Sequence, residues 1–143
     1  MEREMFPTVV ADIMSSPVIK IDGEANVRDA ALLMMDKGIG CIIVMGRGRP
    51  IGIVTERDIL ERVVAPCRDP CEVKVKEIMS TPLITISKDE SILEAMRRMR
   101  KHGIGRLVVM EDERLEGIVT DGDILRAVSL SALSSFKTLL HIG

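Results

Sequence analysis

The sequence predicts an α+β fold made of two copies of one β-α-β-β-α unit. The chain has 143 residues, of which 46% are apolar, so it can bury a hydrophobic core. Met14 recurs as Met79, 65 positions later, and the match around this pair runs without a gap from residue 12 to residue 63. Within each copy, short β-branched runs alternate with segments of helical periodicity, as expected for a mixed unit.

Three segments carry the internal repeat, and each recurs at the same spacing: residues 12–19 with 77–84, 37–40 with 102–105, and 52–60 with 117–125. The two copies are separated by residues 66–73, where two prolines lie among charged residues. The expected organisation is a first repeat at 8–65, a second repeat at 73–129 and a C-terminal helix at 130–143.

Local signals place the individual elements. Pro17 ends a short helical turn, because proline disfavours the α conformation of the residue before it. Gly38 ends the helix that begins at Val27. The expected strands and helices of the first copy are 18–21, 27–37, 41–45, 51–54 and 57–64. Those of the second copy are 83–86, 91–101, 107–110, 115–119 and 122–129. A terminal amphipathic helix over 130–140 carries Leu130, Leu133, Phe136, Leu139 and Leu140.

A single unit of this size buries too little apolar surface to be secure alone. We therefore expect the two units to pack sheet to sheet with pseudo-twofold symmetry. Such an arrangement would create two equivalent clefts at their junction.

Composition and charge exclude several classes of protein. The net charge of −2 provides no basic field for nucleic acid, and 1% aromatic residues cannot form a base-stacking platform. No apolar run is long enough to predict a membrane span. The acidic start, Met1-Glu2-Arg3-Glu4, does not resemble a signal peptide, so we expect a cytoplasmic protein that contacts neither membrane nor, directly, nucleic acid.

The sequence does not predict an enzyme or a metal site. It contains neither a G-x-S-x-G elbow nor a phosphate-binding P-loop, and no nucleophile has a partnered histidine. Cys41 lies in an apolar run typical of a core strand. Cys67 and Cys71 form an isolated C-x3-C, which lacks the four ligands of a structural zinc site; a disulfide across this loop remains open.

The strongest chemical signal is a Gly-apolar-apolar-Thr-x-x-Asp motif that occurs twice, as Thr55 with Asp58 and as Thr120 with Asp123. Each motif leaves a strand and opens a helix. One interpretation is a helix cap, in which the threonine hydroxyl and the aspartate satisfy backbone amides. The other is a nucleotide site: the helix start attracts phosphate, and the carboxylate can accept both hydroxyls of a ribose diol. The pattern alone does not decide between them.

With these motifs the sequence resembles a pair of cystathionine β-synthase (CBS) domains, a Bateman module, over residues 8–129. The resemblance rests on Asp12-Ile-Met-Ser-Ser-Pro and Glu77-Ile-Met-Ser-Thr-Pro, on the two Gly-Ile-Gly turns, and on the two Gly-Ile-Val-Thr motifs. It implies a regulatory module that binds AMP, ADP, ATP or S-adenosylmethionine as a ligand, without a catalytic cofactor.

The resemblance also implies which residues bind the ligand. Asp58 and Asp123 would bind ribose, while Thr55 and Thr120 would lie beside phosphate. Each pair would work with residues of the other repeat. For Thr120 and Asp123 these are Met14, Ile19, Ile39 and Gly40. For Thr55 and Asp58 they are Met79, Ile84, Ile104 and Gly105. Ile53 and Ile118 would flank the base, and Arg57 and Arg106 are the candidate phosphate-neutralising cations.

Two functions follow as expectations. The first is a stand-alone nucleotide sensor that signals to a partner protein the sequence does not identify. The alternative is an interaction or assembly module with empty or vestigial clefts, in which the Thr-x-x-Asp motifs are only helix caps. In both cases we expect a homodimer, because Leu32, Met35 and Met96 lie on helices that one small sheet would not cover fully.

Overall fold

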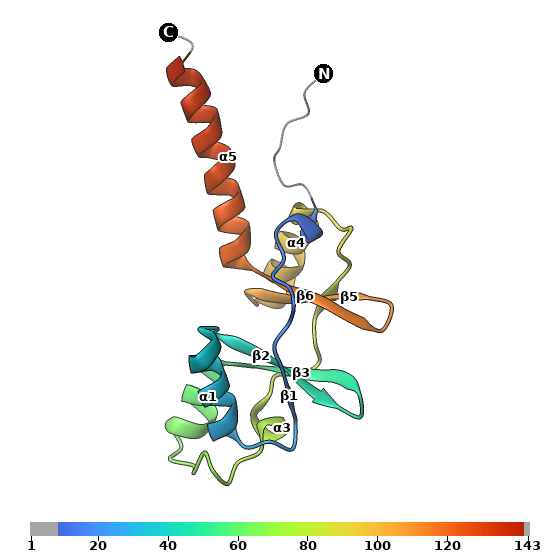
Figure 1. Cartoon of the computed structure of the whole chain (residues 1–143), viewed down its shortest axis with the longest axis vertical. Helices are drawn as coiled ribbons and strands as arrows, with labels where there is room; N and C mark the ends of the chain where they lie inside the picture. The colour runs from blue at the N-terminus through green and yellow to red at the C-terminus, as the bar shows by residue number, and fades with distance from the viewer. Residues whose placement is uncertain (1–8, 142–143) are drawn as a thin grey trace. The chain divides into compact units, whose positions relative to one another are not determined.

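The computed structural model describes residues 9–141, and their side chains except at residue 131 and residues 133–141 (Figure 1). The chain divides into two compact units. The first unit comprises residues 18–83, and the second comprises the described residues 9–17 together with 84–141.

Each unit contains one three-stranded mixed sheet with helices that follow in the predicted order. The elements of the first unit are β1 (Lys20–Asp22), α1 (Val27–Lys37), β2 (Cys41–Gly46), β3 (Arg49–Thr55), α2 (Glu56–Ile59), the π-helical turn η2 (Leu60–Val64) and α3 (Val75–Ile78). Those of the second unit are the 3-10 turn η1 (Val10–Asp12), β4 (Thr85–Ile86), α4 (Ile92–His102), β5 (Arg106–Glu111), β6 (Arg114–Thr120) and α5 (Asp121–His141).

The two sheets have the same topology and the same register. In the first, β1 runs parallel to β2, and β2 runs antiparallel to β3; β4, β5 and β6 repeat this arrangement. The antiparallel ladders pair Cys41 with Thr55 and Arg106 with Thr120, so the threonine of each motif ends its strand at the same place. The predicted tandem α+β repeat is therefore confirmed.

The helix ends follow the local signals of the sequence. Asn26 caps α1 by accepting a hydrogen bond from the Asp29 amide at 2.8 Å, and Ser91 caps α4 by accepting one from Glu94 at 3.0 Å. Gly38 ends α1 with φ of 63° in the left-handed region, which glycine adopts without the penalty of a side chain.

Each compact unit includes the short helical segment that precedes the other repeat's first strand. The Val10 amide donates to the Glu90 carbonyl at 2.9 Å, and the equivalent Val75 amide donates to the Ala25 carbonyl at 2.8 Å. Val10 is fully buried in the core of the second unit. The structural units therefore differ from the sequence repeats, because the segments before β1 and before β4 are exchanged between them.

The core of each unit is built from aliphatic residues on the sheet and the adjoining helices. In the first unit Ile42 and Val54 are fully buried, as are Leu107 and Val119 at the equivalent positions of the second. This distribution follows from the alternation of side chains along strands, which points the apolar face of each sheet toward its helices.

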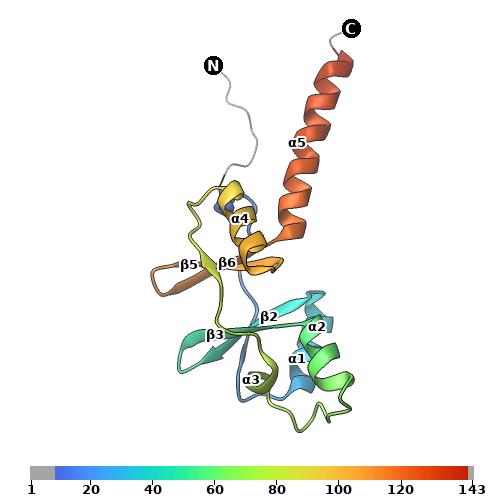
Figure 2. The same ribbon diagram turned by 180° about the vertical axis from the view of Figure 1, so that it is seen from behind.

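Two helical regions differ from the sequence expectation. The expected helix at 57–64 begins as α2 but continues as the wider π-helical turn η2. The segments expected at 122–129 and 130–140 form one continuous helix, α5 (Figure 2). The side chains of Leu133, Phe136, Leu139 and Leu140, expected on the apolar face of that helix, lie outside the described residues.

A carboxylate clamp joins the start of α1 to α3. The Glu24 carboxylate accepts hydrogen bonds from Lys74 at 2.6 Å and from Lys76, and these two ammonium groups lower the pKa of Glu24 from 4.5 to about 2. Because the folded pKa is depressed, the stability from this clamp is fully present above pH 4.5 and is lost as the pH falls toward 2.

We therefore expect Glu24→Gln to reduce stability at neutral pH but to have little effect near pH 2. Denaturant unfolding of both proteins across this pH range measures the difference in free energy of unfolding. Since all three side chains are about half exposed, high salt should shrink the difference at neutral pH. A difference that stays constant down to pH 2 would contradict this assignment.

Candidate functional site

The first Thr-x-x-Asp motif connects the end of β3 to the start of α2. The Thr55 amide donates to Asp58 Oδ2 at 2.9 Å, and the Asp58 amide donates to Thr55 Oγ1 at 3.2 Å. These reciprocal bonds form a capping box. Asp58 is only 7% exposed, which is uncommon for a carboxylate near the start of a helix.

The second motif has the same geometry between β6 and α5. The Thr120 amide donates to Asp123 Oδ2 at 2.8 Å, and the Asp123 amide donates to Thr120 Oγ1 at 3.0 Å. Asp123 is also 7% exposed. The helix-cap interpretation is therefore correct for both motifs as a description of local structure. In each motif the cap uses one carboxylate oxygen of the aspartate, Oδ2.

The other carboxylate oxygen, Oδ1, has different partners in the two units. Asp58 Oδ1 accepts a hydrogen bond from the Ser80 hydroxyl at 3.1 Å and lies 3.8 Å from Arg62 Nη1. Asp123 Oδ1 instead pairs with Arg126, whose side chain is 71% exposed. Both Oδ1 atoms thus face groups that a ligand hydroxyl could replace, and the partner of Asp123 is the more solvent-accessible.

Most amides at the two helix starts already have partners. The Glu56 amide donates to the Gly40 carbonyl at 3.1 Å, and the equivalent Asp121 amide donates to Gly105 at 2.9 Å. The amides of Asp58 and Asp123 bond to the threonine hydroxyls. A phosphate at either helix start would therefore accept its backbone hydrogen bond from the second amide of the helix. This is the amide of Arg57 in the first unit and of Gly122 in the second.

The segments after α3 and after η1 lie against the strands that carry the motifs. Ile53 and Ser80 exchange two backbone hydrogen bonds, of 3.1 and 2.8 Å, and Ile118 and Ser15 exchange an equivalent pair. A Cβ atom at Gly52 would lie 2.5 Å from Met79 Sδ, so Met79 packs directly on β3. Met14 lies equally close to β6, since a Cβ atom at Gly117 would lie 2.9 Å from its Sδ. Each methionine thus packs on the strand that ends in a motif threonine, and its part in ligand binding stays a prediction.

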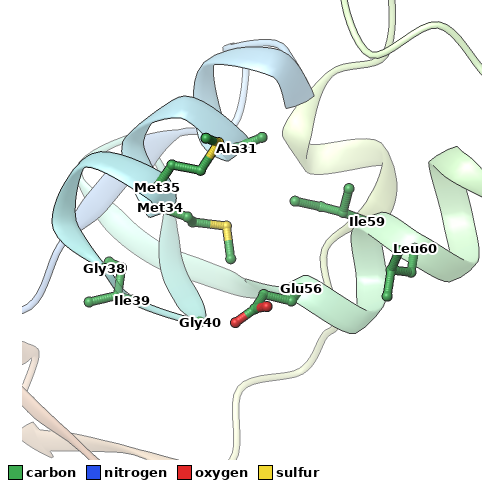
Figure 3. Close-up of a pocket in the computed structure, with 9 residues that line it drawn as sticks. All are labelled: Ala31, Met34, Met35, Gly38, Ile39, Gly40, Glu56, Ile59 and Leu60. Carbon is green, nitrogen blue, oxygen red and sulfur yellow. The ribbon is translucent and has the colours of Figure 1, made fainter.

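Ile39 and Gly40 lie in the unit of Thr55, where they line a groove of about 490 Å³ between α1 and α2 (Figure 3). Met34 and Ile59 point toward one another across this groove, and Glu56 lies at its end near Gly40. Ile104 and Gly105 line the corresponding groove of the second unit. The expectation that these four residues serve the motif of the other repeat stays a prediction.

Ile19 and Ile84 hold their positions through backbone bonds to the central strands. The Ile19 carbonyl accepts from the Ile43 amide at 3.1 Å, and the Ile84 carbonyl accepts from Val108 at 3.0 Å. These carbonyls are therefore engaged within each sheet. Recognition of the adenine edge through backbone hydrogen bonds around Ile19 or Ile84 stays a prediction.

The two candidate cations lie in different surroundings. The Arg57 side chain is 83% exposed and forms an ion pair with Glu61 at 2.6 Å, which raises the pKa of Arg57. Arg106 is half-buried in β5, directly opposite Thr120 in the antiparallel ladder, and forms no ion pair with any described residue. Of the two, Arg106 is the cation positioned beside a motif threonine.

Three residues near the motifs were not among the sequence candidates: Ser80, Arg62 and Arg126. Ser80 belongs to the Ile-Met-Ser segment that occurs in both repeats, so this recurrence could have identified Ser80 as a candidate site residue. The arginines were not detectable in this way, because position 62 corresponds to Ala127 and position 126 to Glu61. Arg62 follows Asp58 by four residues, whereas Arg126 follows Asp123 by three, so the two arginines approach the carboxylates from different positions on their helices.

Within residues 9–141, no group of three His, Cys, Asp or Glu side chains is arranged to hold a metal ion. Cys67 and Cys71 are both exposed free thiols. No described helix combines the length and apolar character needed to span a membrane.

Comparison with known proteins identifies the family. The CBS domain family model matches residues 10–65 and 75–130. The chain is 37% identical over 119 residues to the uncharacterized protein MK0525 of Methanopyrus kandleri, covering 82% of this chain and 61% of that protein. It is 35% identical over 115 residues to the CBS domain-containing protein YhcV of Bacillus subtilis, covering 80% and 81%. The chain spans 42% of the uncharacterized MJ1232 of Methanocaldococcus jannaschii.

Solved structures have the same fold. An uncharacterized conserved protein from Pyrococcus horikoshii has a TM-score of 0.79 at 28% identity, over 88% of this chain and 95% of that one. The CBS domain pair of protein MJ0100, in complex with 5-methylthioadenosine and S-adenosyl-L-methionine, has a TM-score of 0.78 at 28% identity, over 87% and 98%. The hexameric CBS-CP12 protein from bloom-forming cyanobacteria scores 0.78 at 35% identity, over 85% and 68%. With both repeats matched, the chain belongs to the CBS domain family as a tandem CBS pair.

Proposed function

We propose that this CBS pair is a regulatory module that binds adenosine ligands, AMP, ADP, ATP or S-adenosylmethionine, at its two Thr-x-x-Asp motifs. The observation that carries the proposal is the pair of buried carboxylates, each fixed at a helix start by a capping box. Because Oδ2 is held by the backbone, the orientation of Oδ1 is set before any ligand arrives. The adenosine-type ligands of MJ0100, a relative of the same fold, support this ligand class.

The ribose diol is the ligand group that best suits Oδ1. Its vicinal hydroxyls are donors, whereas the carboxylate only accepts. On binding, a ribose hydroxyl would replace Arg126 at Asp123, or Ser80 at Asp58. The displaced arginine is largely solvent-exposed, so it can return to water at little cost. Charge-assisted bonds to a preoriented carboxylate are the stronger class of hydrogen bond.

Phosphate groups should be bound more strongly by the motif of the second unit. Arg106 lies beside Thr120, whereas the equivalent residue beside Thr55 is Cys41. Arg57, the other candidate cation, belongs to the first motif, but its side chain is exposed and already paired with Glu61.

We further propose that the module self-associates as a homodimer and signals to a partner protein through ligand-dependent stiffening. Large apolar side chains are exposed on helices of both units, including Met35 at 78% and Leu125 at 67%. Such surfaces usually mark an interface. The hexameric relative shows that assembly occurs among proteins of this fold.

A second candidate is an assembly module without a ligand. The complete capping boxes favour it, because each motif already has a structural role that accounts for the threonine and the aspartate. This candidate assigns no function to the burial of both carboxylates or to Arg106, and for that reason we place it second.

A thermal-shift panel distinguishes the two candidates. We expect AMP, ADP, ATP or S-adenosylmethionine at about 100 times its Kd to stabilise the protein by about 2.7 kcal/mol. UMP, UDP and UTP serve as controls that carry the same ribose and phosphates without adenine. The absence of Trp and Tyr means that unfolding must be followed with a dye or by calorimetry. Unchanged melting with every adenosine ligand would support the assembly module.

A further inference from the structure

Both oxygens of the Asp58 carboxylate already accept hydrogen bonds from residues of the first unit. Oδ2 accepts from the Thr55 amide at 2.9 Å and from the Thr55 hydroxyl at 3.1 Å. Oδ1 accepts from the Ser80 hydroxyl at 3.1 Å. A ribose hydroxyl would form the same type of bond to a carboxylate. Ser80 thus occupies Oδ1 with the group that the ligand would supply.

The segment around Ser80 is held in place on two sides. Ser80 exchanges two backbone hydrogen bonds, of 3.1 and 2.8 Å, with Ile53 of β3. Arg62 Nη1 donates to the carbonyls of Ile78 at 2.8 Å and of Met79 at 3.2 Å, the two residues before Ser80. Arg62 therefore ties the segment that carries Ser80 to the turn η2.

The equivalent serine of the second unit does not reach its carboxylate. Ser15 exchanges the same pair of backbone bonds with Ile118 of β6. Among the described residues, however, the Ser15 hydroxyl forms no hydrogen bond to Asp123. Ser15 is exposed and follows the 3-10 turn η1, whereas Ser80 is half-buried and follows the α-helical turn α3.

The second unit also has no counterpart of the Arg62 bridge. Ala127 occupies the corresponding position, and an alanine side chain cannot donate to the carbonyls before the serine. Asp123 Oδ1 is paired instead with the exposed Arg126. The two motifs therefore share a capping box but differ in what covers the oxygen proposed for the ribose.

We propose that Ser80 and Arg62 close the first motif, so that an adenosine ligand binds the second motif first. This inference rests on the function proposed above and adds an order of occupancy. At Asp123 the ligand displaces an exposed arginine, which returns to water. At Asp58 it exchanges one hydroxyl for another and leaves the half-buried Ser80 hydroxyl without its acceptor. The first motif therefore binds the same ligand more weakly.

Site-resolved titration with AMP measures the order of occupancy. The methyl resonances of Ile53 and Ile118, each two residues before a motif threonine, report the two motifs separately by NMR. We expect Ile118 to respond at lower AMP concentration than Ile53, and the reverse order would overturn the proposal. Because Arg106 would favour the same order for any phosphorylated ligand, the closure itself is tested by a comparison at the first motif alone.

Ser80→Ala supplies that comparison. Without the serine hydroxyl, the AMP midpoint for Ile53 should fall about 10-fold while that for Ile118 stays constant. Ser15→Ala is the matched control in the second unit and should move neither midpoint. General damage to the fold would weaken binding, so a gain in affinity is specific to the removed contact. An Ile53 midpoint that stays constant or rises in the Ser80→Ala protein would overturn the proposal.

Arg62→Ala tests the bridge, since alanine is the residue found at the equivalent position 127. The segment before Ser80 is then held less firmly, and the AMP midpoint for Ile53 should fall about 2- to 5-fold. A higher midpoint would mean that Arg62 attracts the phosphate of the ligand, and it would overturn the role of Arg62 in the closure.

The same titrations separate this inference from the proposed function. No response of either methyl group to AMP, ADP, ATP or S-adenosylmethionine would remove both together. Equal midpoints at the two motifs, unchanged by Ser80→Ala, would remove the order of occupancy alone.

Discussion

Replacing Asp123 by Asn should weaken binding of the adenosine ligand about 10- to 100-fold, because a charge-assisted hydrogen bond to ribose contributes about 1.5–3 kcal/mol. Asn keeps the size of the side chain but loses the charge and one acceptor. The same substitution should cost about 0.5–2 kcal/mol of stability, since Oδ2 of Asp123 also accepts from the Thr120 amide at 2.8 Å. Titration calorimetry on folded protein and denaturant unfolding measure the two effects separately. Asp58→Asn should behave in the same way.

Ser91→Ala is the matched control for Asp123→Asn. Ser91 caps α4 of the same unit through the Glu94 amide, but it lies on neither motif. Its loss should also cost about 0.5–2 kcal/mol of stability, while the ligand affinity stays unchanged. If Asp123→Asn lowers stability as Ser91→Ala does and leaves affinity intact, the motif is only a helix cap.

Replacing Gly117 by Ala should destabilise the protein by about 1–3 kcal/mol, the usual cost of overpacking. A Cβ atom at Gly117 would lie 2.7 Å from the Ser15 carbonyl oxygen and 2.9 Å from Met14 Sδ. The contact with the Ser15 carbonyl accounts for most of this cost, because that carbonyl is held by its hydrogen bond from the Ile118 amide. The flexible Met14 side chain, in contrast, can move aside. The variant should therefore loosen residues 9–15 from β6, which hydrogen exchange of the Ser15 amide would detect.

Replacing Gly122 by Ala, in the same unit, should instead stabilise the protein. Gly122 lies in the first turn of α5, and the nearest atoms to its Cβ would be 3.6 Å away. Alanine fits this space and is the better helix former, so we expect stabilisation of about 0.5–1 kcal/mol. Equal destabilisation by both substitutions would mean that close packing at Gly117 is not the cause.

Local signals in the sequence were sufficient for much of the fold. Gly38 ends α1 as predicted, and the strands predicted at 41–45 and 51–54 correspond to β2 and β3. The 65-residue recurrence alone implied that the second sheet repeats the first. These features depend on interactions within a few residues or on exact internal repetition, and both can be read along a single chain.

The remaining features depend on contacts between distant segments. No local pattern shows that Val10 is buried with β4–β6 rather than with its own repeat, because this exchange is a property of tertiary packing. The continuity of α5 was missed because the expected helix ended where the repeat ends, although residues 123–141 contain no glycine or proline that would stop it. The partners of the two carboxylates differ because Arg62 and Arg126 are not repeated.

The most direct test of the proposed binding site is a crystal structure of the protein with the adenosine ligand selected by the thermal-shift panel. We predict ribose hydroxyls within hydrogen-bond distance of Oδ1 of Asp123 or Asp58, with the neighbouring Arg126 or Ser80 displaced and the capping box intact. For a phosphorylated ligand, the phosphate at the second motif should contact Thr120 and Arg106. A ligand bound elsewhere, with both Oδ1 atoms still held by their present partners, would contradict the proposed site.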